Sequence, residues 1–202
     1  MKSTARHYHQ QARAESSEAT GRRIIDAFLA RLLNQWFDEI TLDRVAEDAG
    51  VTVQTIVRRF GSKDGLLASA VKVMAVQIEA RRTAPAGNVQ ELVTRLIEDY
   101  EHTGDGVIRL LALEPRYPAL QEVLEFGRKE HRRWVATAFA EPLSKLDAPG
   151  RANALDALVV AMDVYTWKLL RRDMGRSAAG TGRTMTRLTE QTIAASNKQN
   201  GR

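Results

Sequence analysis

The sequence predicts an all-α protein in which a small N-terminal helical unit is joined by a long helix to a larger helical unit. Apolar residues recur at helical spacing along the chain, and no stretch shows the sustained alternation with β-branched residues that a strand requires. The 202 residues are enough to bury a core in one or two domains. A short stretch at 83–88, Thr-Ala-Pro-Ala-Gly-Asn, interrupts the helical pattern and marks the best candidate boundary.

Composition excludes several classes of protein. The chain contains no cysteine, which rules out a disulfide framework, a thiolate zinc site and a cysteine nucleophile, and fits a reducing compartment. The first residues lack the apolar core of a signal peptide, and no apolar run approaches the roughly 20 residues that span a bilayer. We therefore expect a cytoplasmic protein with no membrane partner. The formal net charge of +5 permits binding to a nucleic acid without establishing it.

The chain begins with a polar segment, residues 1–18, which we expect to be a flexible N-terminal arm. Its cations either lie along nucleic-acid phosphates or remain solvated. Residues 17–36 then form the first predicted helix, with Ile24, Phe28, Leu32 and Trp36 on one apolar face.

Two short amphipathic segments follow, at 42–49 and 53–60. Thr41 or Asp43 can cap the first of these helices, and Gly50 suits the left-handed residue that ends it.

Thr52 can cap the second short helix, on which three apolar residues compete for the inner face and four polar residues point outward. The competing residues are Val53, Ile56 and Val57, and the outward ones are Gln54, Thr55, Arg58 and Arg59. Two helices joined by a tight turn that contains glycine form a helix-turn-helix, whose second helix can enter a DNA major groove.

The remainder is predicted as a series of helices: 62–82, 89–102, 107–113, 117–139, 151–174 and 184–195, with a turn at 103–106 and a linker at 175–182. This gives a helix-turn-helix domain at 19–66, a second domain at 67–196 and a polar tail at 197–202. Apolar residues occupy more than one side of residues 154–170, so this helix needs a second cover, which another subunit could supply. The candidate dimer contacts are Leu155, Leu158, Val159, Met162, Leu169 and Leu188.

Several large side chains of the second domain could line a ligand pocket with a few polar groups among them, although core packing would equally explain them. The candidates are Tyr100, Phe126, His131, Trp134, Met162 and Trp167.

One continuous run of residues carries a resemblance to a known family. It comprises RRIIDAFLARLL in the first helix and ITLDRVAEDAGVTVQTIVRRFGSKDGLL after it. With its Ala-Gly-Val turn, its aromatic residue after the second helix and its Ser-Lys-Asp opening of the next, the chain resembles the TetR/AcrR family of bacterial transcriptional regulators over roughly residues 20–70. It departs from the family pattern at Gln54, where relatives usually have a small residue, at Val57, where they have tyrosine, and at Arg59, where many have histidine.

The resemblance implies a fold in which a three-helix DNA-binding bundle is linked by a long helix to a ligand-binding and dimerisation domain. It also implies a homodimeric repressor that binds a palindromic operator in double-stranded DNA and is released by a small-molecule effector. The expected DNA contacts are Thr41, Thr52, Val53, Gln54, Thr55, Arg58, Arg59 and Lys63. We expect Lys63 to hold a phosphate, and Gln54 or Arg58 to read bases.

Two other classes remain open. An all-α enzyme is disfavoured because the chain has no HExxH motif, no P-loop and no GxSxG motif, and we expect no metal and no cofactor. A dimeric regulator or interaction module without small-molecule induction, or one that has lost DNA binding, is the second alternative.

Overall fold

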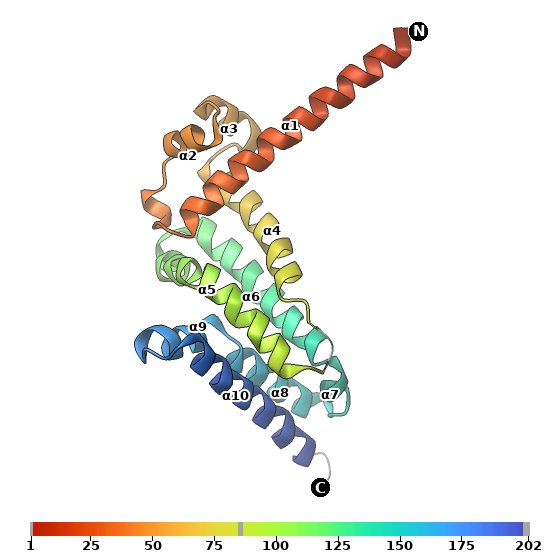
Figure 1. Ribbon diagram of the computed structural model, residues 1–202, viewed down its shortest axis with the longest axis vertical. Coiled ribbons are helices and arrows are strands. Elements are labelled where there is room, and N and C mark those ends of the chain that lie inside the picture. The colour runs from red at the N-terminus through yellow and green to blue at the C-terminus, as the bar shows by residue number, and fades with distance from the viewer. Residues whose placement is uncertain (1, 85–86, 200–202) are drawn as a thin grey trace. The chain divides into compact units, whose positions relative to one another are not determined.

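The structure is a computed structural model that describes the backbone of residues 2–84 and 87–199 and the side chains of residues 15–84 and 87–196. The described backbone is helical and contains no strand, which confirms the predicted all-α class (Figure 1). The chain divides into two compact units, Met1–Met74 and Ala75–Arg202. This division falls inside the long helix, eight residues after the boundary at 66/67 that the sequence suggested.

The first unit begins with helix α1, Lys2–Leu32, so helical backbone starts well before residue 17. The segment expected to be a flexible arm is helical over its described backbone, and the side chains of residues 1–14 lie outside the described part. The helix also ends earlier than predicted, at Leu32. As a result Trp36 is 41% exposed, while Phe37, at the start of the short helix η1 (Phe37–Glu39), is buried instead.

Three further helices complete the N-terminal unit: α2 (Leu42–Ala49), α3 (Val53–Phe60) and the first part of α4 (Lys63–Arg81). Their apolar faces bury a common core against α1. The largest members of this core are Ile24, Phe28, Phe37, Ile40, Ile56, Leu66 and Leu67.

The second unit is a helical bundle in which α5, α6, α8 and α10 lie side by side (Figure 1). Its elements after α4 are α5 (Val89–Leu113), η2 (Glu114–Arg116), α6 (Pro118–Ala138), α7 (Ala140–Ser144), α8 (Ala148–Ala161), α9 (Val164–Lys168), the π-helical turn η3 (Leu169–Asp173) and α10 (Ala178–Gln199). The predicted tail at 197–202 falls outside the described side chains.

The turn predicted at 103–106 is wrong, because α5 runs through it without a break. Gly104 is buried inside this helix, and a Cβ atom at Gly104 would come within 2.5 Å of the indole of Trp167. The glycine therefore serves a close helix–indole approach rather than a change of chain direction.

The single helix predicted at 151–174 is also wrong. Helix α8 ends at Ala161. Asp163 then caps the start of α9, because its carboxylate accepts a hydrogen bond of 2.8 Å from the backbone N–H of Tyr165. The linker predicted at 175–182 is shorter than expected, since α10 begins at Ala178. Among the residues that the structure describes, no helix is long and apolar enough to cross a membrane.

Candidate nucleic-acid interface

The turn between α2 and α3 has the geometry that its sequence predicts. Gly50 has a left-handed backbone with φ of +63°, and the N–H of Val51 bonds back to the carbonyl of Ala46 at 2.9 Å. Thr41 caps α2 by accepting from the N–H of Arg44, and Thr52 caps α3 by accepting from the N–H of Thr55 at 3.2 Å. Both predicted caps are confirmed, so the orientation of α3 relative to α2 is fixed by the turn itself.

The structure decides which apolar residue of α3 faces inward. Ile56 is fully buried, whereas Val57 is 42% exposed. Val57 therefore lies on the outer face of α3 with Gln54 and Arg58, both of which are exposed. Sequence reasoning missed Val57 as an outward residue, because its apolar side chain fits either face of a short amphipathic helix.

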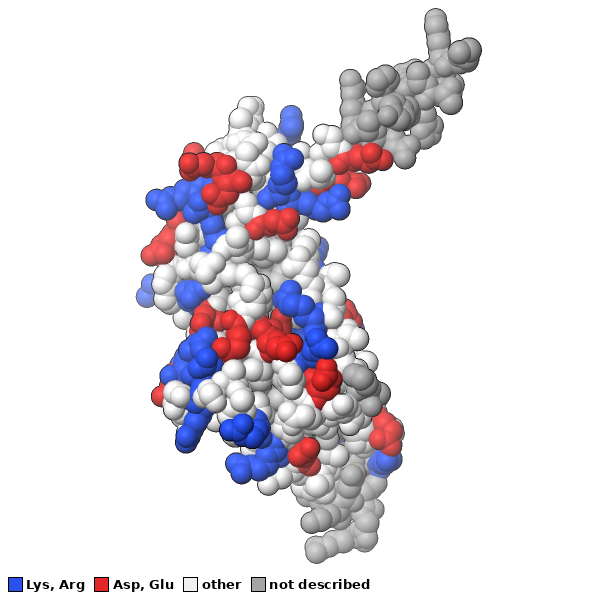
Figure 2. All heavy atoms as spheres, in the orientation of Figure 1, with Lys and Arg blue, Asp and Glu red and all other residues white. Residues whose placement is uncertain are grey.

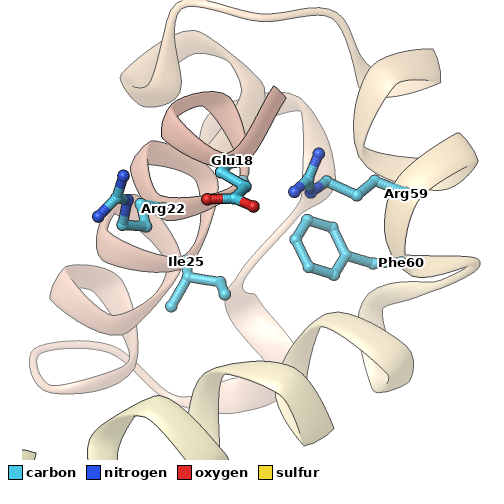
Figure 3. A pocket seen from close by; sticks show the side chains of 6 residues that line it. Glu18, Arg22, Ile25, Arg59 and Phe60 are labelled. Carbon is cyan, nitrogen blue, oxygen red and sulfur yellow. The ribbon is translucent and has the colours of Figure 1, made fainter. Parts of the chain in front are cut away.

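Arg58 and Arg59 differ although they are adjacent. Arg58 is exposed, and its guanidinium makes no hydrogen bond or ion pair within the described part of the chain. The Arg59 guanidinium instead crosses to α1, where it donates to Ser17 Oγ at 2.8 Å and lies against Gly21. Figure 3 shows Arg59 reaching from α3 toward Glu18 on α1. Arg59 is thus tied within the unit, which differs from the outward base-reading role expected for it.

Lys63 also differs from expectation. Its ammonium donates to the carbonyl oxygens of Phe37 at 2.6 Å and Ile40 at 2.8 Å, and it lies 4.2 Å from the centre of the Phe37 ring. Burial lowers the pKa of Lys63, while Asp38 and Asp64 act in the opposite direction. Two of its three donors are therefore committed to the unit, and the geometry assigns Lys63 to fixing the start of α4 on η1.

Helix α1 is held on the helix-turn-helix by polar contacts as well as by the core. Arg31 forms a two-bond ion pair with Asp48 of α2, at 2.6 and 2.9 Å, and the Arg23 guanidinium donates to the carbonyl of Ala49. Exposed ion pairs of this kind contribute at most about 1 kcal/mol. Figure 2 shows basic and acidic side chains interspersed over the visible face of this unit. The visible face therefore carries no large patch of positive charge, and the cations of α3 differ from the others by their place on that helix.

In the second unit, the structure buries three of the six candidate ligand contacts. Tyr100, Met162 and Trp167 belong to the core. The hydroxyl of Tyr100 donates to the carbonyl of Met162 at 3.0 Å, and the indole N–H of Trp167 donates to Glu101 at 3.0 Å. The polar atoms of these aromatic residues thus have partners inside the protein.

The other three candidate ligand contacts do not all lie in one place. Phe126 is exposed, whereas the rings of His131 and Trp134 lie 5.7 Å apart. A buried arginine that sequence reasoning missed, Arg82, lies 4.9 Å from the ring of Tyr100 and 5.2 Å from the ring of Trp134, and it pairs with the fully buried Asp99 at 2.6 Å. Arginine and aspartate are rarely buried, so neither composition nor spacing could have predicted that Arg82 and Asp99 form a buried pair.

The dimer candidates include two residues that a partner could not reach. Leu158 and Met162 are fully buried within the unit, which corrects their predicted place at an interface. Leu155 and Val159 are half-buried, and Leu169 and Leu188 are exposed. Val160, at 65% exposed, and Tyr165 are exposed apolar residues that the prediction omitted. Leu158 and Met162 pack in the core of the unit, and the break after Ala161 changes the helical register only of the residues that follow it, such as Tyr165 and Leu169.

Comparison with known proteins agrees with this geometry. Residues 29–70 match the family model described as bacterial regulatory proteins of the tetR family. The HTH-type transcriptional repressor SCO4008 from Streptomyces coelicolor is 24% identical over 170 residues, which cover 84% of this chain and 88% of the relative.

Solved structures share the fold across most of the chain. A tetR-family transcriptional regulator from Streptomyces coelicolor superposes with a TM-score of 0.71 at 16% identity, covering 91% of this chain and 86% of that one. A transcriptional regulator from a Rhodococcus species superposes with a TM-score of 0.65 at 14% identity, covering 89% and 97%. The capped helix-turn-helix thus coincides with the match to the tetR family of bacterial regulatory proteins over residues 29–70, and the chain as a whole shares the fold of a solved tetR-family regulator.

Proposed function

We propose that the protein is a homodimeric, sequence-specific DNA-binding transcriptional repressor. One observation carries this proposal: the outer face of α3 presents Gln54, Val57 and Arg58 to solvent, while the buried Ile56 and the Thr52 cap hold the helix in place. A rigid helix with exposed polar tips is what readout in the major groove requires. The relative named as a transcriptional repressor supports the direction of regulation.

Each residue of α3 then has a role set by its chemistry. Gln54 is long enough to form the paired hydrogen bonds that recognise adenine, and Val57 can pack on a thymine methyl group. Thr41 and the free N–H groups at the start of α2 suit a phosphate, because a helix N-terminus is partially positive. Arg59 and Lys63 keep the helices in place, and we assign them no base contact.

Dimerisation follows from how little one such helix can read. An α3 of eight residues spans only a few base pairs, so two copies related by a two-fold axis must combine their contacts on a palindromic operator. Exposed apolar residues of the second unit offer a surface for this association. They are Val160, Tyr165, Leu169 and Leu188.

Release by a small-molecule effector completes the proposal. An effector can lower operator affinity only if it binds more tightly to a dimer geometry in which the two α3 helices no longer match successive grooves. In the second unit, Arg82 lies among Tyr100, His131 and Trp134 and is paired with Asp99, and we assign to these groups the orientation of such a ligand.

The test is selection of binding sites from random duplexes by the full chain, combined with sedimentation at micromolar concentration. We expect an enriched two-fold symmetric sequence whose half-sites are about one helical turn apart, bound by two chains. Recovery of no enriched sequence, or a monomer at these concentrations, would contradict the proposal. A duplex carrying the enriched site can then be screened for small molecules that displace the protein.

A further inference from the structure

Beside the outer face of α3 lies a groove, lined in part by Arg58 and Arg59, to which the roles above assign no ligand. We propose that this groove, between α1 and α3, holds a phosphate of the DNA backbone and so extends the interface beyond the helix-turn-helix. The proposal rests on the proposed function, since it names a further part of the same DNA interface.

The groove has a volume of about 430 Å³ and is lined by residues of both helices. Those residues are Ser16, Ser17, Thr20, Thr55, Arg58 and Arg59. Two are cations and four are hydroxyl-bearing, and the lining includes no carboxylate. The lining therefore has the chemistry that recognises a phosphodiester, which offers acceptor oxygens and one negative charge.

Arg59 also lines a second hollow, of about 300 Å³. The second hollow is lined by Glu18, Gly21, Arg22, Ile25, Arg59 and Phe60, most of which Figure 3 labels. It has two arginines, as the groove does, but it also has the carboxylate of Glu18 and no hydroxyl group that could donate to a phosphate. The two hollows flank the same arginine, so the difference in their linings assigns the phosphate to the hydroxyl-rich side.

The groove keeps unused donors for an anion. Within the described residues the Arg58 guanidinium has no partner, and the hydroxyl of Ser17, which accepts from Arg59, makes no other hydrogen bond, so its own hydrogen remains for donation. Thr20, by contrast, already donates to the carbonyl of Ser16, so its contribution is to shape the wall. Arg58 with Ser17 thus supplies a cation and a hydroxyl from opposite sides of the groove.

The position of the groove fits a backbone contact. Thr55 and Arg58 are three residues apart on α3 and share one side of the helix. Arg58 also borders the outer face that carries Gln54. A phosphate of the strand that flanks the bases read by α3 would enter the groove from that border, and phosphate contacts of this kind fix the register of a protein on its duplex.

The test compares charge changes at neighbouring positions of α1. Thr20→Glu places a carboxylate in the groove and repels a phosphate. Ala19→Glu makes the same charge change at an exposed position that does not line the groove, and is the matched control. Ser16→Lys adds a cation to the groove, so it should have the opposite effect on binding. It also remains informative if circular dichroism shows that Thr20→Glu does not fold.

Binding is measured by fluorescence anisotropy on a duplex of random sequence, as a function of salt, because the contact is to the backbone and independent of sequence. We expect Thr20→Glu to weaken binding about tenfold more than Ala19→Glu does. The slope of log affinity against log salt should become shallower by about 0.9 for each phosphate lost, and Ser16→Lys should tighten binding and steepen the slope.

The possible outcomes distinguish failure of the phosphate-binding groove from failure of the proposed DNA-binding function. If the wild type binds DNA while Thr20→Glu matches Ala19→Glu in affinity and slope, and Ser16→Lys matches the wild type, the groove holds no phosphate although the regulator function stands. If the wild type binds no duplex even at low salt, both proposals fall. If inorganic phosphate at millimolar concentration weakens wild-type binding more than sulfate at equal ionic strength does, while Thr20→Glu shows no difference, free phosphate competes with the DNA backbone for the groove, which supports the proposed contact.

Discussion

The guanidinium of Arg59, near the end of α3, donates a hydrogen bond of 2.8 Å to the hydroxyl of Ser17 on α1, 42 positions earlier in the chain. The same guanidinium lies against Gly21, where a side chain would collide with it at 2.5 Å. The recognition helix is thus braced at its C-terminal end by α1, in addition to the turn that orients its N-terminal end. The account of α3 as a positioned reading helix depends on this brace.

Replacing Arg59 by alanine should therefore loosen α3 without changing which bases it reads. We expect a stability loss of about 1 kcal/mol for one exposed charged hydrogen bond and a similar fall in affinity for every duplex sequence. Arg59→Lys, which can still reach Ser17, is the matched control and should recover much of the loss. A relaxed preference at one base pair in Arg59→Ala would instead identify Arg59 as a base reader.

The structure predicts that Lys63 stabilises the fold, whereas the sequence suggests that it contacts a phosphate. Lys63→Met leaves the carbonyls of Phe37 and Ile40 without their donor, so we expect urea unfolding to show a loss of about 1–3 kcal/mol. The salt slope of DNA binding should stay that of the wild type, because no phosphate contact is removed. A slope shallower by about one would restore Lys63 to the phosphate contacts.

His131 should make stability depend on pH. Burial, and secondarily the charge of Arg82, lowers its pKa from 6.5 to about 4. A pKa that is lowered on folding means that the unfolded chain takes up the proton first, so the stability that neutral His131 provides is complete above pH 6.5 and is lost as pH falls toward 4. The full loss is roughly 3 kcal/mol.

The measurement is urea unfolding at about pH 7 and about pH 4.5 for the wild type and for His131→Phe, which cannot take up a proton. The variant should lose less stability than the wild type between these two values. His102→Gln, which changes an exposed histidine of the same unit, is the control and should behave as the wild type does. Parallel losses in all three proteins would show that His131 is not the group responsible.

Replacing glycine by alanine should have opposite effects on stability at two helical positions. Gly104→Ala would press a methyl group into the indole of Trp167, at 2.5 Å, and should cost about 1–3 kcal/mol of stability. Gly127→Ala in α6 meets open space and should instead stabilise the protein by up to about 1 kcal/mol, since alanine favours a helix. Thermal unfolding of both variants checks the pair, and an unchanged midpoint for Gly104→Ala would contradict the close approach to Trp167.

The helix-turn-helix was the most predictable part of the molecule from sequence. Thr41, Gly50 and Thr52 act through local backbone geometry, so residue type and spacing are sufficient to place them. Arg59 and Lys63 could not be placed in this way, because their partners lie at least 23 positions away and a long cationic side chain can turn either to solvent or back onto the protein.

The second unit shows the same limit more strongly. A glycine can end a helix or admit a neighbouring ring, and only the position of Trp167 shows that Gly104 does the latter. The helix that the pattern predicts across Asp163 is interrupted because aspartate also starts helices, and its role as a cap changes the register of the residues that follow it. Leu158 and Met162, which precede this cap, belong to the core rather than to the predicted dimer face, because an apolar side chain suits a core and an interface equally.

The central claim is that the exposed face of α3 reads DNA sequence, and the specificity of Gln54→Ala tests it most directly. The measurement is the affinity of the wild type and of the variant for the selected duplex, and for duplexes in which each base pair of one half-site is changed in turn. We expect Gln54→Ala to lose about 1–3 kcal/mol on the selected duplex and to become indifferent to the identity of one base pair in the half-site. If the variant kept the wild-type preference at every position, α3 would not be the reading element and the account would be wrong.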